Sequence, residues 1–224
     1  MSEECEARVK AHLAAFLSDG QRVLEISSSS FSSLFPESVA LGRKEIFLFN
    51  QTSLAGPHFE LPFKAAAFDA VHVSAGIEFF NDPQDAFKEI WRVLSPGGRC
   101  FVTFLNKLSP AEEMKPLKMW TTMNEEQKIW IVGSYFHYSA GEGWTGIEGY
   151  DLFSASSQAL IFEKKEESSS AAYIVQASKS DLPSLEESSF NFTMRKLSGV
   201  RHLTTDDCKY NVRNLLILSY KTHI

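Results

Sequence analysis

The sequence has few of the features that mark specialised protein classes. Its 224 residues include only three cysteines, Cys5, Cys100 and Cys208, and this odd, widely spaced set is no disulfide framework or zinc-ligand pattern. No apolar run approaches the roughly 20 residues that span a bilayer. The acid-rich first residues are not typical of a signal or transit peptide. We therefore expect a cytoplasmic protein in a reducing compartment, with no membrane partner.

Positive charge is also scarce. The chain has 22 Lys and Arg against 28 Asp and Glu, which gives a net charge of −6. Because binding to nucleic-acid phosphates needs clustered basic residues, we expect no nucleic-acid partner. Hydrophobic residues make up 44% of the chain and include 18 Phe, so the sequence predicts one sizeable, aromatic-rich core.

The first 140 residues alternate short apolar strands with amphipathic helices. Asp82 is a suitable N-cap and Pro83 a suitable first residue for a helix whose apolar residues share one face. This alternation predicts an α/β fold with a doubly wound, mostly parallel sheet and helices on both faces. Strands are expected at residues 22–26, 45–49, 68–74 and 99–104. The predicted core residues are Leu24, Ile26, Val71, Val73, Phe87, Ile90, Val93, Leu94, Phe101 and Val102.

The pattern weakens from about residue 150. We expect one helix over 119–138, a glycine-rich turn at Gly141–Gly149 and a pair of strands at 159–163 and 172–177. The polar stretch that follows predicts a domain boundary. Residues 1–177 would form the main domain and residues 178–224 a C-terminal extension that can pack on the same domain. Within that extension, 190–197 and 214–219 have strand-like patterns.

Residues 61–104 have the order of elements seen in one known family. A Leu-Pro-Phe turn precedes the strand that starts at Phe68-Asp69, a helix ends near Leu94, and Pro96-Gly97-Gly98 precedes the next strand. This order is similar to the second half of class I S-adenosylmethionine (SAM)-dependent methyltransferases of type 11. The resemblance implies a Rossmann-like methyltransferase fold, SAM as cofactor, and methyl transfer to a small molecule or a protein. It covers residues 22–104 well and the remainder loosely or not at all.

The loop that holds the cofactor in this family contains no glycine here. Glu25 matches the family's acidic residue, but Ser27–Ser33 has serines where glycines are usual. Glycine permits a left-handed backbone under the ligand, and that conformation costs serine about 1–2 kcal/mol per residue. Two alternatives follow. Either serine hydroxyls bind SAM and Glu25 takes part, or the pocket is partly closed, Glu25 only caps loop N–H groups, and SAM binding is weak or lost.

Other positions that the resemblance assigns to the cofactor match the family pattern only in part. Asn50 stands where the family has a carboxylate for the ribose, and Ser74 ends the third strand at the expected ligand edge. The predicted cofactor-binding residues are Glu25, Ser27, Ser29, Asn50 and Ser74. No metal site is predicted. The chain is then a methyltransferase or, alternatively, a catalytically inactive methyltransferase-like interaction module.

No catalytic residue is assigned, because methyl transfer can proceed through positioning without a general base. His72 lies in a buried strand and is more typical of a core histidine. His137 and Tyr138, at the end of the expected helix, are candidates for substrate contact. Glu78 follows the third strand, where a solvated rim position is expected.

Overall fold

A computed structural model of the chain describes residues 1–28, 33–50, 58–74, 76–106, 116–140, 143–153, 171–180, 192–196 and 199–203. Its strands are β1 (Arg22–Ser27), β2 (Arg43–Leu48), β3 (Phe68–Ser74), β4 (Leu94–Leu105), β5 (Trp144–Asp151), β6 (Ala172–Lys179), β7 (Phe192–Lys196) and β8 (Gly199–Leu203). Its helices are α1 (Glu3–Ala14), the 3-10 helix η1 (Ile77–Phe79), α3 (Pro83–Val93), α4 (Lys118–Thr122) and α5 (Glu125–Ser139).

All the described strands lie in one sheet with the order β2-β1-β3-β4-β6-β5-β7-β8. The first four are parallel, whereas β6 runs antiparallel to β4 and β5. The four strands expected from the sequence are therefore neighbours, which confirms the doubly wound fold. The chain moves outward from β1 to β2 on one side and from β3 to β4 on the other. The strand order thus reverses between β1 and β3, and this pair is the topological switch point.

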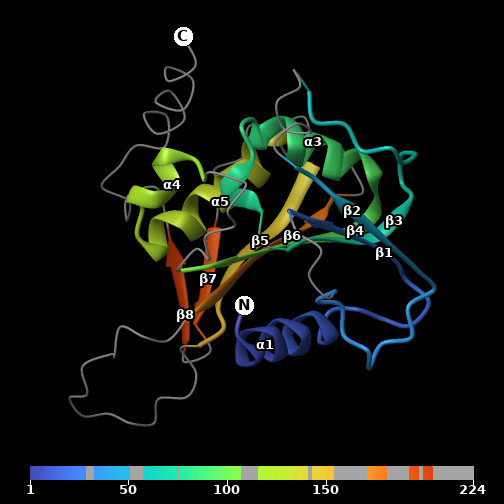
Figure 1. The fold of residues 1–224 in the computed structure, drawn as a ribbon, viewed down its shortest axis with the longest axis horizontal. Helices are drawn as coiled ribbons and strands as arrows, with labels where there is room; N and C mark the ends of the chain where they lie inside the picture. Colours follow the sequence, from blue (N-terminus) through green and yellow to red (C-terminus); the bar gives the residue numbers. More distant parts are fainter. Residues whose placement is uncertain are drawn as a thin grey trace.

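Helices cover the two faces of the sheet unequally (Figure 1). Helix α1 lies on one face, while α3, α4 and α5 lie on the other. Alternate residues of β1 divide between two cores because successive side chains of a strand point to opposite faces: Val23 packs with α1, and Leu24 with the larger core. All ten predicted core residues are completely buried, at 0% exposure.

The region after residue 118 differs from the expectation of one helix and a turn. Two helices form because Asn124 and Gln127 cap α5 reciprocally, so a new helix begins there. Residues 144–149 of the expected turn belong to strand β5. Its Gly146, at φ 60°, lies where the register with β6 shifts between Thr145 and Glu148, so this glycine serves a bulge within a strand.

The C-terminal part of the chain is described only in pieces. The expected strand at 172–177 is confirmed as β6, which continues to Lys179, and that at 190–197 is confirmed as β7, which pairs with β5. The predicted strands at 159–163 and 214–219 lie outside the described residues. The domain boundary after residue 177 stays a prediction. Among the described helices, none has the length and apolar character needed to cross a bilayer.

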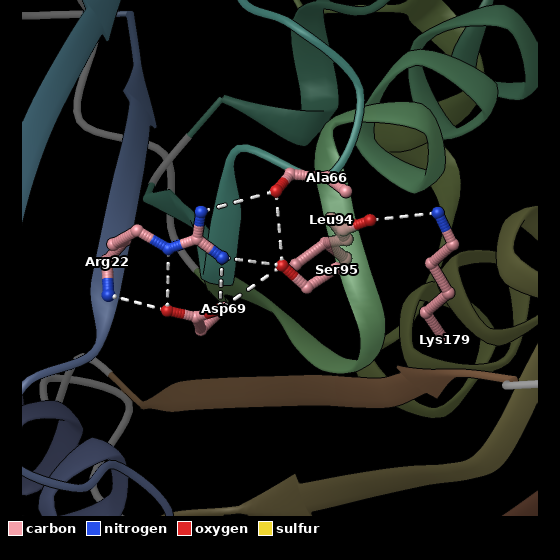
Figure 2. Close-up of polar contacts among 6 residues, drawn as sticks. All are labelled: Arg22, Ala66, Asp69, Leu94, Ser95 and Lys179. Atoms are coloured by element: carbon pink, nitrogen blue, oxygen red, sulfur yellow. Dashed lines mark hydrogen bonds and ion pairs between the residues drawn. The ribbon is translucent and has the colours of Figure 1, made fainter.

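A polar network joins the first residues of three parallel strands (Figure 2). The Arg22 guanidinium donates to both carboxylate oxygens of Asp69, at 2.6 and 3.0 Å, and to Ser95 Oγ at 2.8 Å. These bonds lower the pKa of Asp69 to about 2, chiefly through the Arg22 side chain. Beside them, Lys179 Nζ donates to the Leu94 carbonyl at 2.8 Å, which fixes β6 to the end of α3. The network lies at the amino ends of β1, β3 and β4, away from the edge where ligands bind.

The Leu-Pro-Phe turn is held by the last turn of α3. Arg92 donates to the carbonyls of Phe63 at 2.8 Å and Leu61 at 3.0 Å, and Glu89 accepts the Leu61 N–H at 3.0 Å. Together with the Arg22 network, these contacts give an architectural role to the segment that resembles the family best. The resemblance over residues 61–104 is therefore evidence for the fold and does not by itself establish activity.

Candidate functional site

The carboxyl ends of β1, β2 and β3 meet at the topological switch point, where doubly wound sheets bind their ligands. Ser27 at the end of β1 pairs with Leu48 of β2 on one side and with Ser74 of β3 on the other. Asn50 follows β2 by two residues and is exposed. The structure thus brings Ser27, Ser74 and Asn50 to one edge, as predicted, while the predicted Ser29 lies outside the described residues.

Glu25 lies two residues before this edge along β1, on the α1 face. Its Oε1 accepts the backbone N–H of Leu34 at 3.1 Å and lies 3.8 Å from His72 Nδ1. This contact matches the capping alternative, because it fixes the returning loop onto β1. Its second oxygen, Oε2, is buried and has no hydrogen-bond partner within the described ranges. One oxygen of Glu25 is therefore structural, and the other is unsatisfied as far as the described residues show.

His72 is a core histidine, as expected. It is completely buried, and its Nε2 lies 2.7 Å from Thr103 Oγ1. Burial lowers the pKa of His72 to about 4, so the ring is neutral near pH 7. A neutral, enclosed imidazole between two strands supports packing and cannot reach a ligand at the edge.

The backbone strain expected for the serine loop is absent from its first residues. Ser27 is the last residue of a regular strand, and Ala66, at φ 56°, is the only non-glycine residue with positive φ in the described parts of the chain. The expected cost of a left-handed serine therefore does not apply to Ser27 or Ser28. Ser29 and Ser30 lie outside the described residues, so the choice between the two alternatives for this loop stays open.

The sequence analysis missed the importance of Phe49, which follows β2 directly. A Cβ added to Gly76, two residues after β3, would lie 2.5 Å from Phe49 Cζ. Since β1 lies between β2 and β3, the ring reaches past the end of β1 to make this contact. It is 2% exposed and packs on Phe80 with ring centroids 5.2 Å apart. The inner part of the switch point is thus filled by an aromatic side chain.

Glu78 is the second residue that the sequence analysis misjudged. It lies in η1, only 5% exposed, and its Oε2 is buried without a hydrogen-bond partner among the residues that the structure describes. The Glu78 backbone carbonyl accepts the N–H of Leu117, the residue before α4, at 2.9 Å. Burial raises the pKa of Glu78 to about 7, and Lys128 opposes this shift. The expected solvated rim position is therefore wrong.

Lys128 interacts electrostatically with Glu78, and Trp120 lies next to Lys128, near the carboxyl end of β4. Lys128 of α5 is buried, and its Nζ lies 3.4 Å from the Asn106 carbonyl and 5.6 Å from the centroid of the Trp120 ring. Trp120 of α4 is also buried, and its Nε1 has no hydrogen-bond partner in the described part of the chain. A carboxyl group, an ammonium group and an indole N–H, here called the Glu78 cluster, thus share one enclosed region.

His137 and Tyr138 lie at the opposite end of α5. The helix begins near Asn106 at the carboxyl end of β4, where Lys128 is anchored, and ends at Ser139. Ser139 accepts the indole N–H of Trp144, the first residue of β5, so this end lies toward the amino ends of the parallel strands. The two candidates for substrate contact are therefore not at the ligand edge.

The raised pKa of Glu78 predicts a pH-dependent cost to stability. The folded protein holds the proton with a pKa of about 7 and the unfolded chain with the ordinary pKa of 4.5, so stability falls as pH rises between these values. We expect Glu78→Gln to be nearly neutral at pH 5 and to stabilise by on the order of 1–3 kcal/mol at pH 8. Urea unfolding at both pH values checks this. A variant that is less stable than the native chain at pH 8 would contradict it.

Comparisons with known proteins agree with this geometry. Residues 32–102 match the methyltransferase domain family. The chain is 42% identical over 87 residues to the ubiquinone/menaquinone biosynthesis C-methyltransferase UbiE of Ruegeria sp. (strain TM1040), a match over 38% of this chain and 34% of that protein. It is 50% identical over 42 residues to the demethylmenaquinone methyltransferase of Thermus thermophilus, over 19% of each chain. The chain thus spans about a third or less of these relatives.

A solved structure supports the fold at low sequence identity. In the complex between the Haloferax volcanii Trm112 methyltransferase activator and the putative methyltransferase, the matched chain superposes with a TM-score of 0.51 and 13% identity. The match covers 80% of this chain and 92% of that one. Together with the strand order, this match shows that the chain has a class I methyltransferase-like fold, and its residues 32–102 resemble the methyltransferase domain family.

Proposed function

We propose that the chain binds SAM at the carboxyl edge of β1 and β2 and transfers its methyl group to a small-molecule acceptor. The observation that supports this most is that the segment matching a methyltransferase family contains the strands around the switch point. The segment that matches the methyltransferase domain family, residues 32–102, includes β3, one of the two strands of the switch point, and also β2 and most of β4, which lie on either side of that pair. Ligands bind at such points in doubly wound sheets.

The residues at this edge fit SAM in two respects. Asn50 is exposed at the end of β2, where its amide can hydrogen-bond the ribose hydroxyls. Glu25 offers a buried carboxylate oxygen that lacks a partner within the described ranges, and a cationic donor such as the methionine ammonium would satisfy it. Ser27 and Ser74 are paired residues at the carboxyl ends of β1 and β3, at the same edge. When bound, SAM supplies an electrophilic methyl group on its sulfonium.

The relatives suggest a first class of acceptor. They are named as methyltransferases of ubiquinone and menaquinone biosynthesis and of demethylmenaquinone. A quinol-type ring with a weakly acidic hydroxyl is therefore the acceptor class that we propose to test first. Because the matched segments are short, this class is an inference from the relatives.

One observation favours a second candidate function, a methyltransferase-like module without turnover. The Phe49 ring fills the inner part of the switch point against Gly76, and both it and Phe80 are buried. SAM must then bind on the outer side of this ring or displace it. If the ring excludes the cofactor, the chain would act through its surface, and calorimetric titration with SAM separates the two functions.

The Asn50 position gives a sharper test of the cofactor site. We expect Asn50→Asp to raise the affinity for SAM by about 5- to 10-fold, because a carboxylate makes stronger hydrogen bonds to the ribose hydroxyls than an amide does. Ser38→Asp adds the same charge at another exposed position and serves as the control. Equal gains in both variants would indicate a general charge effect, and no gain in either would argue against a ribose contact at Asn50.

A further inference from the structure

The Glu78 cluster has three buried polar groups with unused hydrogen-bonding capacity. Glu78 Oε2 is an acceptor and Trp120 Nε1 a donor, and neither has a partner in the chain segments that the structure describes. Within the described ranges, Lys128 Nζ makes one long hydrogen bond, 3.4 Å, to the Asn106 carbonyl. Buried polar groups are ordinarily paired, since each unpaired group costs free energy. Such a combination is typical of a site that is completed by a ligand.

The position of the cluster agrees with an acceptor site next to the cofactor edge. Glu78 lies in the loop that follows β3, and β3 is one of the two strands of the switch point. Lys128 and Trp120 approach it from α5 and α4, on the face opposite α1. The contact of Leu117 N–H with the Glu78 carbonyl joins these elements. A molecule held here would lie beside the edge formed by Ser27, Asn50 and Ser74.

We propose that Glu78, Lys128 and Trp120 bind the ionisable hydroxyl group of the methyl acceptor, with Glu78 as the base that takes its proton. This inference rests on the proposed function and adds the chemistry of the acceptor. The hydroxyl donates to Glu78 Oε2. Its O–H bond breaks, the proton moves to Oε2, and the electron pair stays on the acceptor oxygen. Lys128 and the Trp120 N–H then stabilise the oxyanion.

The charges around the cluster suit this transfer. Burial raises the pKa of Glu78 and lowers the pKa of Lys128, so the ionised form of each group is destabilised. Glu125, near the start of α5, raises the pKa of Lys128 and is exposed to solvent. Tyr173 of β6 stacks on Phe104, which contacts Trp120, and is a further titratable neighbour among the described residues. A weakly acidic hydroxyl supplies both the proton and the negative charge that the cluster can accept.

A chromogenic phenol tests the proposal without any cofactor. We use 4-nitrophenol as the probe because only its phenolate absorbs visible light, so one titration of the full chain reports binding and ionisation together. The native chain is expected to bind it and to increase the phenolate fraction at a fixed pH. Glu78→Gln should weaken binding by about 10- to 100-fold and abolish the added phenolate. Trp120→Phe, which keeps an aromatic ring and removes the N–H, should weaken binding by about 3- to 10-fold.

The matched control is Glu126→Gln, which changes an exposed carboxylate on the same helix as Lys128 and should leave binding within about two-fold. Thermal unfolding of each variant at pH 8 separates binding from folding. Weaker binding by Glu78→Gln with an unchanged or higher unfolding midpoint supports the proposal. A lower midpoint with unchanged binding, or no binding by the native chain, overturns it. Because SAM is absent from this experiment, a failure of the cofactor site leaves its outcome unaffected.

Discussion

Ile90→Ala is expected to lower the free energy of unfolding by about 2–5 kcal/mol. Ile90 is completely buried on α3, whose neighbouring Phe87 packs edge-on against Phe136 of α5 with ring centroids 4.7 Å apart. Truncation removes apolar surface from the larger core and leaves a cavity, since a helix held on both sides cannot close onto it. Urea unfolding followed by circular dichroism measures the loss.

Ile46 offers a matched control for this truncation. It is the same residue type, lies on the outer strand β2 and is 50% exposed. We expect Ile46→Ala to change stability by roughly 0.5 kcal/mol or less. A loss at Ile90 well under about 2 kcal/mol, or losses of equal size at the two positions, would show that the register of α3 is wrong.

Gly98→Ala is the second substitution with a large expected effect. A Cβ at this position would lie 2.7 Å from the Ser95 carbonyl oxygen and 3.0 Å from the Asp69 carbonyl oxygen. Both are backbone atoms in a region held by the Arg22 network, so neither can move cheaply. We expect a loss of about 1–3 kcal/mol in the free energy of unfolding.

The adjacent Gly97 is constrained by its backbone conformation, so substitutions there serve as the control for Gly98. Its φ of 71° lies in the left-handed region, where asparagine is enriched. Gly97→Asn should therefore cost less than Gly98→Asn, although both introduce the same side chain. Urea unfolding of the two variants compares these reasons. A larger loss of stability for Gly97→Asn than for Gly98→Asn would contradict steric crowding as the reason for glycine at position 98.

The parallel half of the fold could be predicted because local and tertiary signals agree there. Strands such as β3 are mostly apolar and the helix after Asp82 has one apolar face, so burial follows from the sequence pattern alone. In β5 the signals conflict. Its glycines are typical of turns, and the bulge that requires Gly146 exists only when β6 lies beside it.

The candidate site was harder to predict because it depends on what covers each side chain. Glu78 is a charged residue just after a strand, and the groups that approach it, Leu117 and Lys128 of α5, are distant in sequence. Phe49 likewise gains its role from Gly76 across the sheet. The Asn50, Ser27 and Ser74 edge was predictable, since strand ends are visible in the sequence and parallel strands align them.

A crystal structure with S-adenosylhomocysteine, the demethylated product of SAM, tests the central claim most directly. The claim is that the carboxyl edge of β1 and β2 is a cofactor site in a chain whose loop lacks glycine. The structure should show the ribose against Asn50 and the amino-acid part over Ser27, with Phe49 either in contact with the ligand or displaced. Ligand density at another place, or an empty edge at saturating concentration, would contradict the claim.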